Sequence, residues 1–248
     1  MSPPEKPLLL ITAGPSREYF DDVRFLSNGA SGSLGIALAR GAAARGWDVH
    51  LALGPTHLEP PPEVTTHRFV SATDLEQICI DLWPRVDTFI ATAAVCDYRP
   101  AERYAGKRKK GLEDWAPQMM RTPDVLAGRG AEKGERTLVG FSLESGAGPE
   151  EAERKLVKKN LDLILWNTPS NLGTSQGRYT WVEAVPASRE ESSSNEAHGE
   201  GSPRTGATSL RVRELGLLPK EEVAAEILDF VGERRVRRRG PVRPDEEE

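Results

Sequence analysis

The most chemically suggestive segment of the sequence is a glycine-rich loop, Ser27–Gly35, which reads Ser-Asn-Gly-Ala-Ser-Gly-Ser-Leu-Gly. Small residues directly before a predicted helix let backbone N–H groups approach an anion, and the helix dipole favours negative charge at the same point. The loop therefore predicts local binding of a phosphate group. The same composition also suits an ordinary strand-to-helix loop, so this pattern alone does not distinguish a phosphate site from such a loop.

Further polar clusters lie at or after the carboxyl ends of predicted strands. Asp97 follows one strand, Phe141 lies in another, and the basic run Lys107–Lys110 occupies a loop. Lys155 and Lys159 lie four residues apart, which places them on one face of a predicted helix. Because open α/β sheets bind ligands at this edge, we expect these clusters to come together there. Taken singly, each is also compatible with a solvated loop or a surface ion pair.

Two other chemistries are less well supported. A dinucleotide-binding loop occupies the tight first strand-to-helix turn, whereas about fourteen residues separate the first predicted strand from these glycines. The second strand ends in Leu53-Gly54-Pro55, with no acid to hold a ribose. An NAD(P)-dependent reductase therefore remains only an alternative. Cys96 lies beside Asp97, but no histidine occurs in a recognisable nucleophile motif, which disfavours Cys–His catalysis.

Strands and helices alternate along the chain. A capping box at Thr73–Glu76 and the hydrophobic periodicity predict the helices, while short apolar runs predict strands buried on both faces. We expect strands at 8–12, 49–53, 88–94, 137–143 and 162–166, and helices at 34–45, 73–84, 124–130, 150–160 and 220–231. This alternation predicts an α/β fold with a doubly wound, mainly parallel sheet and helices on both faces. Segments 179–185 and 210–215 predict a C-terminal β-hairpin extension.

The 248 residues predict one domain, 1–232, with two polar appendages. Hydrophobic residues make up 38 % and charged residues 29 %, which is ordinary for a globular protein with a core. Segment 186–208 is rich in Ser, Glu, Gly and Asn and predicts a disordered insert. Residues 233–248 form a run of arginines followed by acids, which predicts a disordered, solvated tail.

The net charge, the cysteine content and the N-terminal sequence limit the kinds of partner, metal site and cellular location that we expect. A formal net charge of −5 gives no indication of a nucleic-acid partner. The two cysteines, Cys79 and Cys96, belong to no metal-binding pattern, so we expect neither structural zinc nor a disulfide scaffold. The first residues lack the pattern of a signal peptide, and no apolar run is long enough for a membrane span. We therefore expect a cytoplasmic protein.

Several motifs taken together resemble the phosphopantothenate-cysteine ligase (phosphopantothenoylcysteine synthetase) family of coenzyme A biosynthesis. The resemblance runs from about Leu8 to Asn167. It is carried, in this order, by the segments 11–18, 22–28, 31–32, 93–99, 107–110, 122–127, 139–141 and 159–163, with a weaker similarity at 218–228.

This resemblance implies a Rossmann-like homodimer that uses CTP or ATP with Mg²⁺. Such an enzyme makes an acyl-nucleotide from 4′-phosphopantothenate, releasing pyrophosphate, and cysteine's amine then displaces CMP or AMP to form the amide. The substrates are small molecules, so neither nucleic acid nor membrane is expected as a partner. Because the chain lacks the flavin-dependent decarboxylase to which bacterial members are commonly fused, we expect a free-standing ligase.

The resemblance also implies roles for individual residues. Asn28 matches the residue that orients the acyl intermediate, and Arg24 is a plausible contact for the phosphate of the substrate. Lys107 matches a catalytic lysine on a mobile flap over the triphosphate, and few apolar residues surround it. The expected nucleotide contacts are Gly14, Ser31, Gly32, Ala91, Thr92, Ala93, Asp97, Lys107, Pro123, Asp124, Val125, Leu126, Phe141, Lys155 and Lys159. The ligands of the metal ion are not predicted.

The sequence departs from the family pattern at three positions. Ser33 stands where a lysine is usual, Thr168 replaces the Asp of an Asn-Asp pair, and Thr122 replaces the usual Asn before Pro-Asp. A non-catalytic nucleotide-binding relative is therefore a second alternative. Retention of both Asn28 and Lys107 favours the enzyme, because a binding module does not need a residue at the acyl group.

Overall fold

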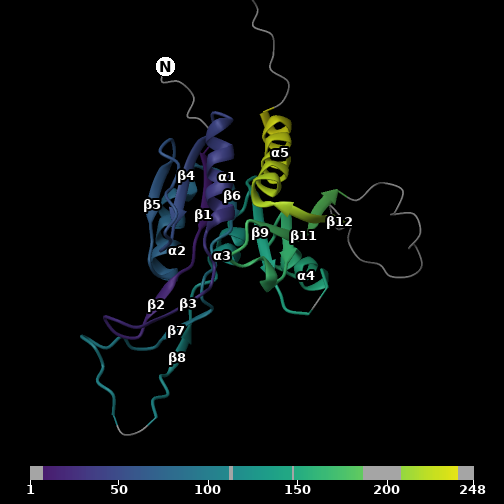
Figure 1. Cartoon of the computed structure of the whole chain (residues 1–248). Coiled ribbons are helices and arrows are strands. Elements are labelled where there is room, and N and C mark those ends of the chain that lie inside the picture. Colours follow the sequence, from purple (N-terminus) through teal and green to yellow (C-terminus); the bar gives the residue numbers. More distant parts are fainter. Residues whose placement is uncertain (1–7, 112–113, 147, 187–207, 240–248) are drawn as a thin grey trace, which may run out of the picture.

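A computed structural model describes residues 8–111, 114–146, 148–186 and 208–239. Its centre is an eight-stranded sheet in the order β12-β11-β10-β9-β6-β1-β4-β5 (Figure 1). The strands are β1 (Leu8–Ala13), β4 (Asp48–Leu53), β5 (Thr65–Arg68), β6 (Val86–Ala91), β9 (Thr137–Leu143), β10 (Leu163–Asn167), β11 (Gln176–Pro186) and β12 (Thr208–Pro219). The strands from β5 to β10 in this order pair in parallel, whereas β11 and β12 pair antiparallel. The order of the parallel strands is that of dinucleotide-binding folds, with its reversal between β1 and β6.

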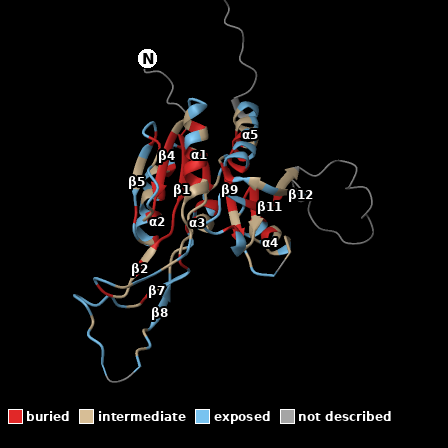
Figure 2. Ribbon diagram, viewed as in Figure 1, coloured by how far each residue is buried: buried red, intermediate tan, exposed pale blue. Residues whose placement is uncertain are grey.

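Helices cover both faces of this sheet, as predicted. They are α1 (Ser33–Ala44), α2 (Ala72–Leu82), α3 (Val125–Ala131), α4 (Glu150–Lys158) and α5 (Lys220–Arg239), with short 3₁₀ turns at Trp83–Arg85 and Pro169–Asn171. Leu9 and Ile11 of β1 pack in the same core cluster as α1 and α5, while Leu8 and Leu10 pack with α2 to α4. The uninterrupted apolar run of β1 is explained because this strand is buried on both faces. Figure 2 shows the central strands buried between the helices.

The start of α2 differs from the sequence prediction. Ser71 is the N-cap residue, and its hydroxyl accepts the backbone N–H of Asp74, whose carboxylate in turn accepts the N–H of Ser71. The predicted capping box at Thr73 and Glu76 is thus wrong by two residues. Several capping-type side chains follow one another here, and the sequence pattern does not say which of them adopts the extended backbone of an N-cap.

The C-terminal hairpin β11–β12 is present and is longer than expected. It pairs antiparallel from Gln176 with Pro219 to Pro186 with Thr208. The hairpin therefore extends the sheet by two strands beyond β10. The predicted disordered insert falls almost wholly on 187–207, outside the described residues. None of the described helices is long and apolar enough to cross a membrane.

Helix α5 is longer than the sequence indicated, and this corrects the predicted boundary at 232. The helix continues to Arg239, so 233–239 is not a disordered tail. Arg235 pairs with both carboxylate oxygens of Asp87, at 3.0 Å from Nε and 2.6 Å from an Nη. Arg234 donates to Asp162, 3.2 Å away, and its guanidinium lies over Phe230. The arginines predicted to be solvated therefore attach α5 to the body of the fold.

Ending the chain at residue 232 is expected to lower the free energy of unfolding by about 2–3 kcal/mol, because Asp162 and Asp87 lose partly buried partners. A chain ending at Arg239 keeps all of these contacts and serves as the control. Thermal and urea unfolding of both truncations measures the difference. Equal stability of the two truncations would show that Arg234 and Arg235 contribute nothing.

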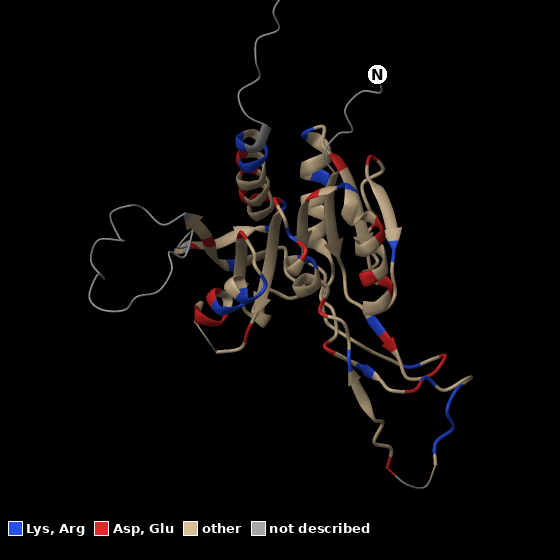
Figure 3. Cartoon of the chain, turned by 180° about the vertical axis from the view of Figure 1, so that it is seen from behind, with Lys and Arg blue, Asp and Glu red and all other residues tan. Residues whose placement is uncertain are grey.

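Two short hairpins, which were not predicted from the sequence, form an arm at one end of the sheet. One hairpin joins β2 (Arg17–Tyr19) to β3 (Phe25–Ser27), and the other joins β7 (Tyr98–Pro100) to β8 (Met119–Arg121). The arm extends from the carboxyl edge of the parallel sheet (Figure 1). Figure 3 shows a basic stretch on its long loop, where Lys107–Lys110 lie.

Candidate active site

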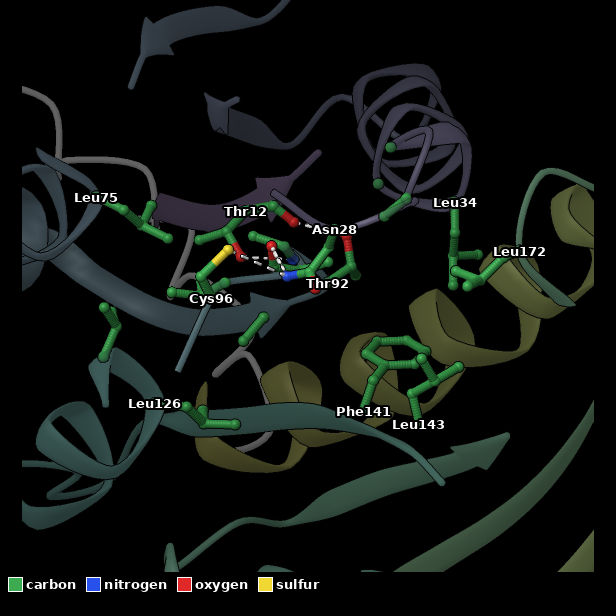
Figure 4. Close-up of a pocket in the computed structure, with 18 of the residues that line it drawn as sticks. Thr12, Asn28, Leu34, Leu75, Thr92, Cys96, Leu126, Phe141, Leu143 and Leu172 are labelled. Atoms are coloured by element: carbon green, nitrogen blue, oxygen red, sulfur yellow. Dashed lines mark hydrogen bonds between the residues drawn. The ribbon is translucent and has the colours of Figure 1, made fainter. Parts of the chain in front are cut away.

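A cavity of about 740 Å³ opens at the carboxyl edge of the sheet, beside the ends of β1, β6 and β9 (Figure 4). It lies where the strand order reverses, the position at which open α/β sheets bind ligands. The wall is formed by the glycine-rich loop, the segment after β6, the start of α3, the turn around residue 172 and the first residue of α5. The cavity thus collects residues from both ends of the chain.

Glycines bring the start of α1 against the sheet. Gly14 and Gly32 both have φ of +81°, and a Cβ on Gly32 would lie 3.0 Å from the backbone nitrogen of Gly14. A Cβ on Gly35 would lie 2.3 Å from that of Ala13 and 2.7 Å from the hydroxyl of Thr92. Larger residues would therefore push the helix away from the ends of β1 and β6.

The first turn of α1 is suited to an anion. Its N-cap residue is Gly32, which has no side chain to cap the helix, and no acid occurs in the first turn. Within the described residues, the one side-chain contact to the first N–H groups is a long one, 3.4 Å from the N–H of Ser33 to the hydroxyl of Ser31. Exposed N–H groups and the helix dipole together favour a negatively charged ligand at such a point. The helix starts in the wall of the cavity, because Gly32, Ser33 and Leu34 all line it.

Hydrogen bonds fix the strand ends beneath the cavity. The Thr92 hydroxyl donates to the carbonyl of Thr12, 2.6 Å away, and the Thr12 hydroxyl accepts the N–H of Ala93 at 3.1 Å. Asn28 reaches across from the glycine-rich loop and donates its amide to the carbonyl of Ala94, 2.8 Å away. Figure 4 shows Thr12, Asn28 and Thr92 grouped at one side of the cavity. The loop and the end of β6 are thereby held together.

The cavity wall also contains two aspartates with different surroundings. Asp124 caps α3 through the N–H of Ala127 and pairs with Lys159, whose Nζ lies 2.8 Å from one of its oxygens. Asp97 is exposed, and its carboxylate forms no hydrogen bond or ion pair within the described residues, although its carbonyl accepts the N–H of Thr122. Asp97 is therefore free to bind a ligand, whereas Asp124 is already engaged.

Most of the residues singled out from the sequence line this cavity. They are Asn28, Ser31, Gly32, Ala91, Thr92, Ala93, Asp97, Pro123, Asp124, Val125, Leu126, Phe141 and Lys159. Gly14 lies directly beneath the loop, against Gly32. Arg24, Lys107 and Lys155 do not line the cavity. The structure thus brings most of the expected site residues together around one cavity, and three of the expected cationic side chains lie outside that cavity.

Arg24 belongs to the arm rather than to the cavity wall. Its guanidinium donates to the buried carboxylate of Asp21 and to the carbonyl of Arg108, 2.7 Å away. This guanidinium, with backbone N–H groups that include that of Arg108, holds the pKa of Asp21 well below its usual range. Arg24 therefore ties the β2–β3 hairpin to the long loop of the arm.

Lys107 lies exposed on that loop, between two tethered neighbours. Asp22 accepts the N–H of Gly106 at 2.7 Å, and Asp21 accepts the N–H of Arg108 at 3.2 Å. The Arg108 guanidinium lies 4.7 Å from the ring centre of Trp115. The expectation of a loop with little to anchor it is therefore wrong on both sides of Lys107.

Lys155 pairs with carboxylates beyond the cavity. Its ammonium contacts Glu144, and Glu151 on the same helix lies 3.8 Å away. Of the two lysines, Lys159, the C-cap residue of α4, lines the cavity, whereas Lys155 does not. The i,i+4 spacing predicted a shared helix face but could not show where that face ends.

Several residues of the wall were not predicted from the sequence, and Lys220 is the most unusual of them. Lys220 begins α5, is 7 % exposed, and burial lowers the pKa of its ammonium. Asn167 also lines the cavity, and its side-chain oxygen is buried without a hydrogen-bond partner. Lys220 lies in the weakly similar segment 218–228, but that similarity did not place it in the site, because its position at the cavity depends on the packing of α5 against α1.

Cys96 lines the cavity but lacks the surroundings of a nucleophile. Burial raises the pKa of its thiol, so the thiolate is disfavoured, and none of the cavity-lining residues is a histidine. This agrees with the low weight given to Cys–His catalysis from the sequence.

Known proteins resemble this chain over most of its length. Residues 5–197 match the family described as DNA/pantothenate metabolism flavoprotein C-terminal domain. The chain is 40 % identical over 166 residues to the Coenzyme A biosynthesis bifunctional protein CoaBC of Escherichia coli (strain K12). That match covers 65 % of this chain and 41 % of the relative, so the chain spans less than half of that protein.

Two solved structures share the fold. The crystal structure of the C-terminal domain of Coenzyme A biosynthesis bifunctional protein CoaBC has a TM-score of 0.69 and 35 % identity, covering 91 % of this chain and 93 % of the other. A structure described as a Cab2 mutant H337A complex with phosphopantothenate-cysteine has a TM-score of 0.63 at 15 % identity, covering 93 % of this chain and 89 % of the other. At that identity, the second likeness concerns the fold alone.

Proposed function

Since the chain belongs to the DNA/pantothenate metabolism flavoprotein C-terminal domain family, we propose that it is a phosphopantothenate-cysteine ligase. It joins 4′-phosphopantothenate to cysteine through an acyl-nucleotide made from CTP or ATP. The observation that carries this proposal is that Asn28, the uncapped start of α1 and the free carboxylate of Asp97 meet around one cavity.

The reaction requires two displacements. In the first, a carboxylate oxygen of phosphopantothenate attacks the α-phosphorus of the nucleotide, and the bond to pyrophosphate breaks. In the second, cysteine's amine attacks the acyl carbon, the nucleoside monophosphate leaves with the bridging oxygen, and the amine loses a proton. Both steps bring anions or developing negative charge together, so cations and oriented N–H donors lower the barrier.

The cavity offers groups for these demands. We infer that the first N–H groups of α1 bind phosphate oxygens and that Asp97 binds a ribose or a metal ion, since both lie at the cavity. The side-chain amide of Asn28 donates to the carbonyl of Ala94 at 2.8 Å and, over a longer 3.9 Å, to the sulfur of Cys96. We infer that the second, more weakly bound amide hydrogen turns to the acyl group when substrate binds. Phe141 supplies an apolar wall for the base or the substrate. An oriented mixed anhydride needs correct positioning more than it needs a strong base.

Mg²⁺ would enter with the nucleotide. Magnesium bound to a nucleotide is typically held by phosphates, waters and one or two carboxylates. The described residues contain no cluster of three or more His, Cys, Asp or Glu side chains that could hold a metal alone. Asp97 fits the single-carboxylate arrangement because its oxygens are free. When bound, the ion would neutralise charge on the triphosphate.

Pyrophosphate release tests the proposal. Purified protein is given 4′-phosphopantothenate with CTP or with ATP, with and without cysteine. The proposal expects pyrophosphate with one of the nucleotides only when phosphopantothenate is present, and the amide only when cysteine is added. Binding of nucleotide without any turnover would instead favour a non-catalytic relative.

We also propose that the protein is a homodimer joined through the arm. The arm exposes apolar side chains to a considerable extent, among them Val23 (54 % exposed), Phe25 and Met120. Such a patch is typical of a protein–protein contact. The arm also carries Lys107, which does not line the cavity of its own chain, and we propose that this lysine serves the cavity of the second copy.

Replacing Val23 with glutamate is therefore expected to convert dimers to monomers without lowering the melting temperature of the monomer, because the Val23 side chain packs against little in its own chain. Val157→Glu, on the exposed face of α4, serves as the control and should remain dimeric. Sedimentation velocity measures both variants. A wild-type protein that is a fully active monomer would contradict the proposal.

A further inference from the structure

Lys220 presents a buried positive charge to the cavity without a carboxylate partner. It is 7 % exposed and lines the cavity, and it forms no ion pair within the part of the chain that the structure describes. The other lysine of the wall, Lys159, pairs with Asp124. A buried charge is costly unless it is paired or well hydrogen-bonded, so this ammonium calls for an anionic partner.

Two hydrogen bonds fix the position of the Lys220 ammonium. Nζ donates to the hydroxyl oxygen of Ser33, 2.8 Å away, and to the carbonyl of Thr174. An ammonium has three N–H donors, so one is left over. Ser33 is the first residue of α1, and the ammonium therefore lies at the point where the N–H groups of that helix face the cavity.

The Ser33 hydroxyl is also held in position by hydrogen bonds and has a hydrogen left to donate. Its oxygen accepts from Lys220 and from the hydroxyl of Ser31, 3.1 Å away. With both acceptor positions used, the Ser33 hydrogen is available for donation. The Lys220 ammonium, the Ser33 hydroxyl and the N–H groups of the helix therefore form a set of hydrogen-bond donors at one point of the cavity.

Packing between α1 and α5 builds this arrangement. A Cβ on Gly41 of α1 would lie 2.8 Å from a methyl carbon of Leu228 on α5, so the helices approach closely. Ala37 and Ala42 of α1 share one core cluster with Val223 and Ile227 of α5. The backbone N–H of Lys220 is also fixed by the carbonyl of Ser175, 3.0 Å away. The ammonium is therefore held rigidly and does not depend on a flexible surface side chain.

We propose that Lys220, with Ser33 and the first turn of α1, binds a phosphate group of one of the two phosphorylated substrates. The inference rests on the proposed function and gives a role to a residue that lies in the weakly similar segment 218–228 but to which that similarity assigned none. The phosphate can come from the nucleoside triphosphate or from 4′-phosphopantothenate. Both present the same anionic oxygens, so the experiment treats them as separate arms.

Lys220→Gln is the central variant, because glutamine still donates a hydrogen bond while the charge is removed. Lys158→Gln, which removes an exposed lysine of α4, is the matched control. Calorimetry measures binding of CTP, ATP and 4′-phosphopantothenate separately to each protein. A lost charge-assisted hydrogen bond corresponds to about tenfold to hundredfold weaker binding. We expect such a loss for one ligand class with Lys220→Gln and none with Lys158→Gln.

Melting temperatures separate this role from a purely structural one. If Lys220 serves the ligand, the ligand-free variant melts no lower than wild type, while the stabilisation caused by the phosphate ligand shrinks. A lower melting temperature with an unchanged ligand-induced shift would assign Lys220 to the fold alone. Should Lys220→Gln not fold, Ser33→Ala tests the same donor set with a smaller change, and it should weaken binding of a phosphate ligand.

The amide-forming assay on the same preparations separates the two proposals. If wild type forms the amide while both ligands bind Lys220→Gln and Ser33→Ala as tightly as wild type, this inference is overturned and the ligase function stands. If wild type binds neither phosphate ligand, both proposals fail.

Discussion

Asn28→Asp is expected to lower the rate of amide formation by about a hundredfold to a thousandfold, which corresponds to the ~2.7–4 kcal/mol typical of a lost transition-state donor. Asn28 lies on the glycine-rich loop and donates its amide to the carbonyl of Ala94 at 2.8 Å. A carboxylate cannot donate there, and its charge would repel both that carbonyl and the acyl-phosphate. Nucleotide binding should survive, because Asp97, Phe141 and the start of α1 are unchanged.

Asn28→Ala is the matched control, since it removes the donor without adding a charge. It should lose less activity than Asn28→Asp. Calorimetry with the nucleotide and single-turnover formation of the amide measure the two effects. If nucleotide affinity falls as much as the rate in Asn28→Asp, Asn28 serves the nucleotide rather than the acyl group.

Lys107→Gln should also lower turnover by about a hundredfold or more, because a cation near departing pyrophosphate acts on charge that develops in the transition state. Binding of free nucleotide should weaken much less. Within the described residues, the Lys107 ammonium is exposed and forms no ion pair, so its loss should leave the fold intact. Lys110→Gln, on the same loop, is the control. An equal loss of turnover in both variants, or a greater loss in Lys110→Gln, would contradict the role proposed for Lys107.

Mixing variants tests whether Lys107 acts in the neighbouring subunit. In a mixed dimer of an Asn28→Asp chain and a Lys107→Gln chain, action across the interface leaves one cavity with both native residues. Activity should then reappear on mixing, although each variant alone is nearly inactive. If mixing restores nothing although mixed dimers form, Lys107 acts on the cavity of its own chain.

Much of the fold could be predicted because its signals are local. The apolar run at Leu8–Ala13 is buried on both faces, and a strand at the centre of a parallel sheet requires this pattern. The polar residues after β1 and β6 line one cavity because parallel strands end at the same edge. Asn28, Asp97 and Phe141 could therefore be grouped from the sequence alone.

The other features of the fold and of the site could not be predicted, because they depend on contacts between segments that are distant in the sequence or on strands too short to show a pattern. Strands of three residues, such as β2 and β8, are too short to show a period of two, so the arm was missed. Arg24 was expected to contact the phosphate of the substrate because it lies near Asn28. The structure shows that its guanidinium pairs with the buried carboxylate of Asp21, a contact the sequence did not reveal, and its role toward the substrate stays a prediction. Arg235 was assigned to a solvated tail because nothing local reveals Asp87 as its partner. The position of Lys220 likewise follows from helix packing.

The proposed function depends above all on one step, in which the carboxylate of phosphopantothenate is activated by transfer of a nucleotidyl group in this cavity. Isotope transfer tests this step most directly. 4′-Phosphopantothenate labelled with ¹⁸O in its carboxylate is converted with cysteine and the preferred nucleotide, and the products are weighed by mass spectrometry. We expect one labelled oxygen to move to the phosphate of CMP or AMP, since that oxygen bridges the acyl carbon and the α-phosphorus. Label in inorganic phosphate, or no label in the nucleoside monophosphate, would contradict activation by nucleotidyl transfer.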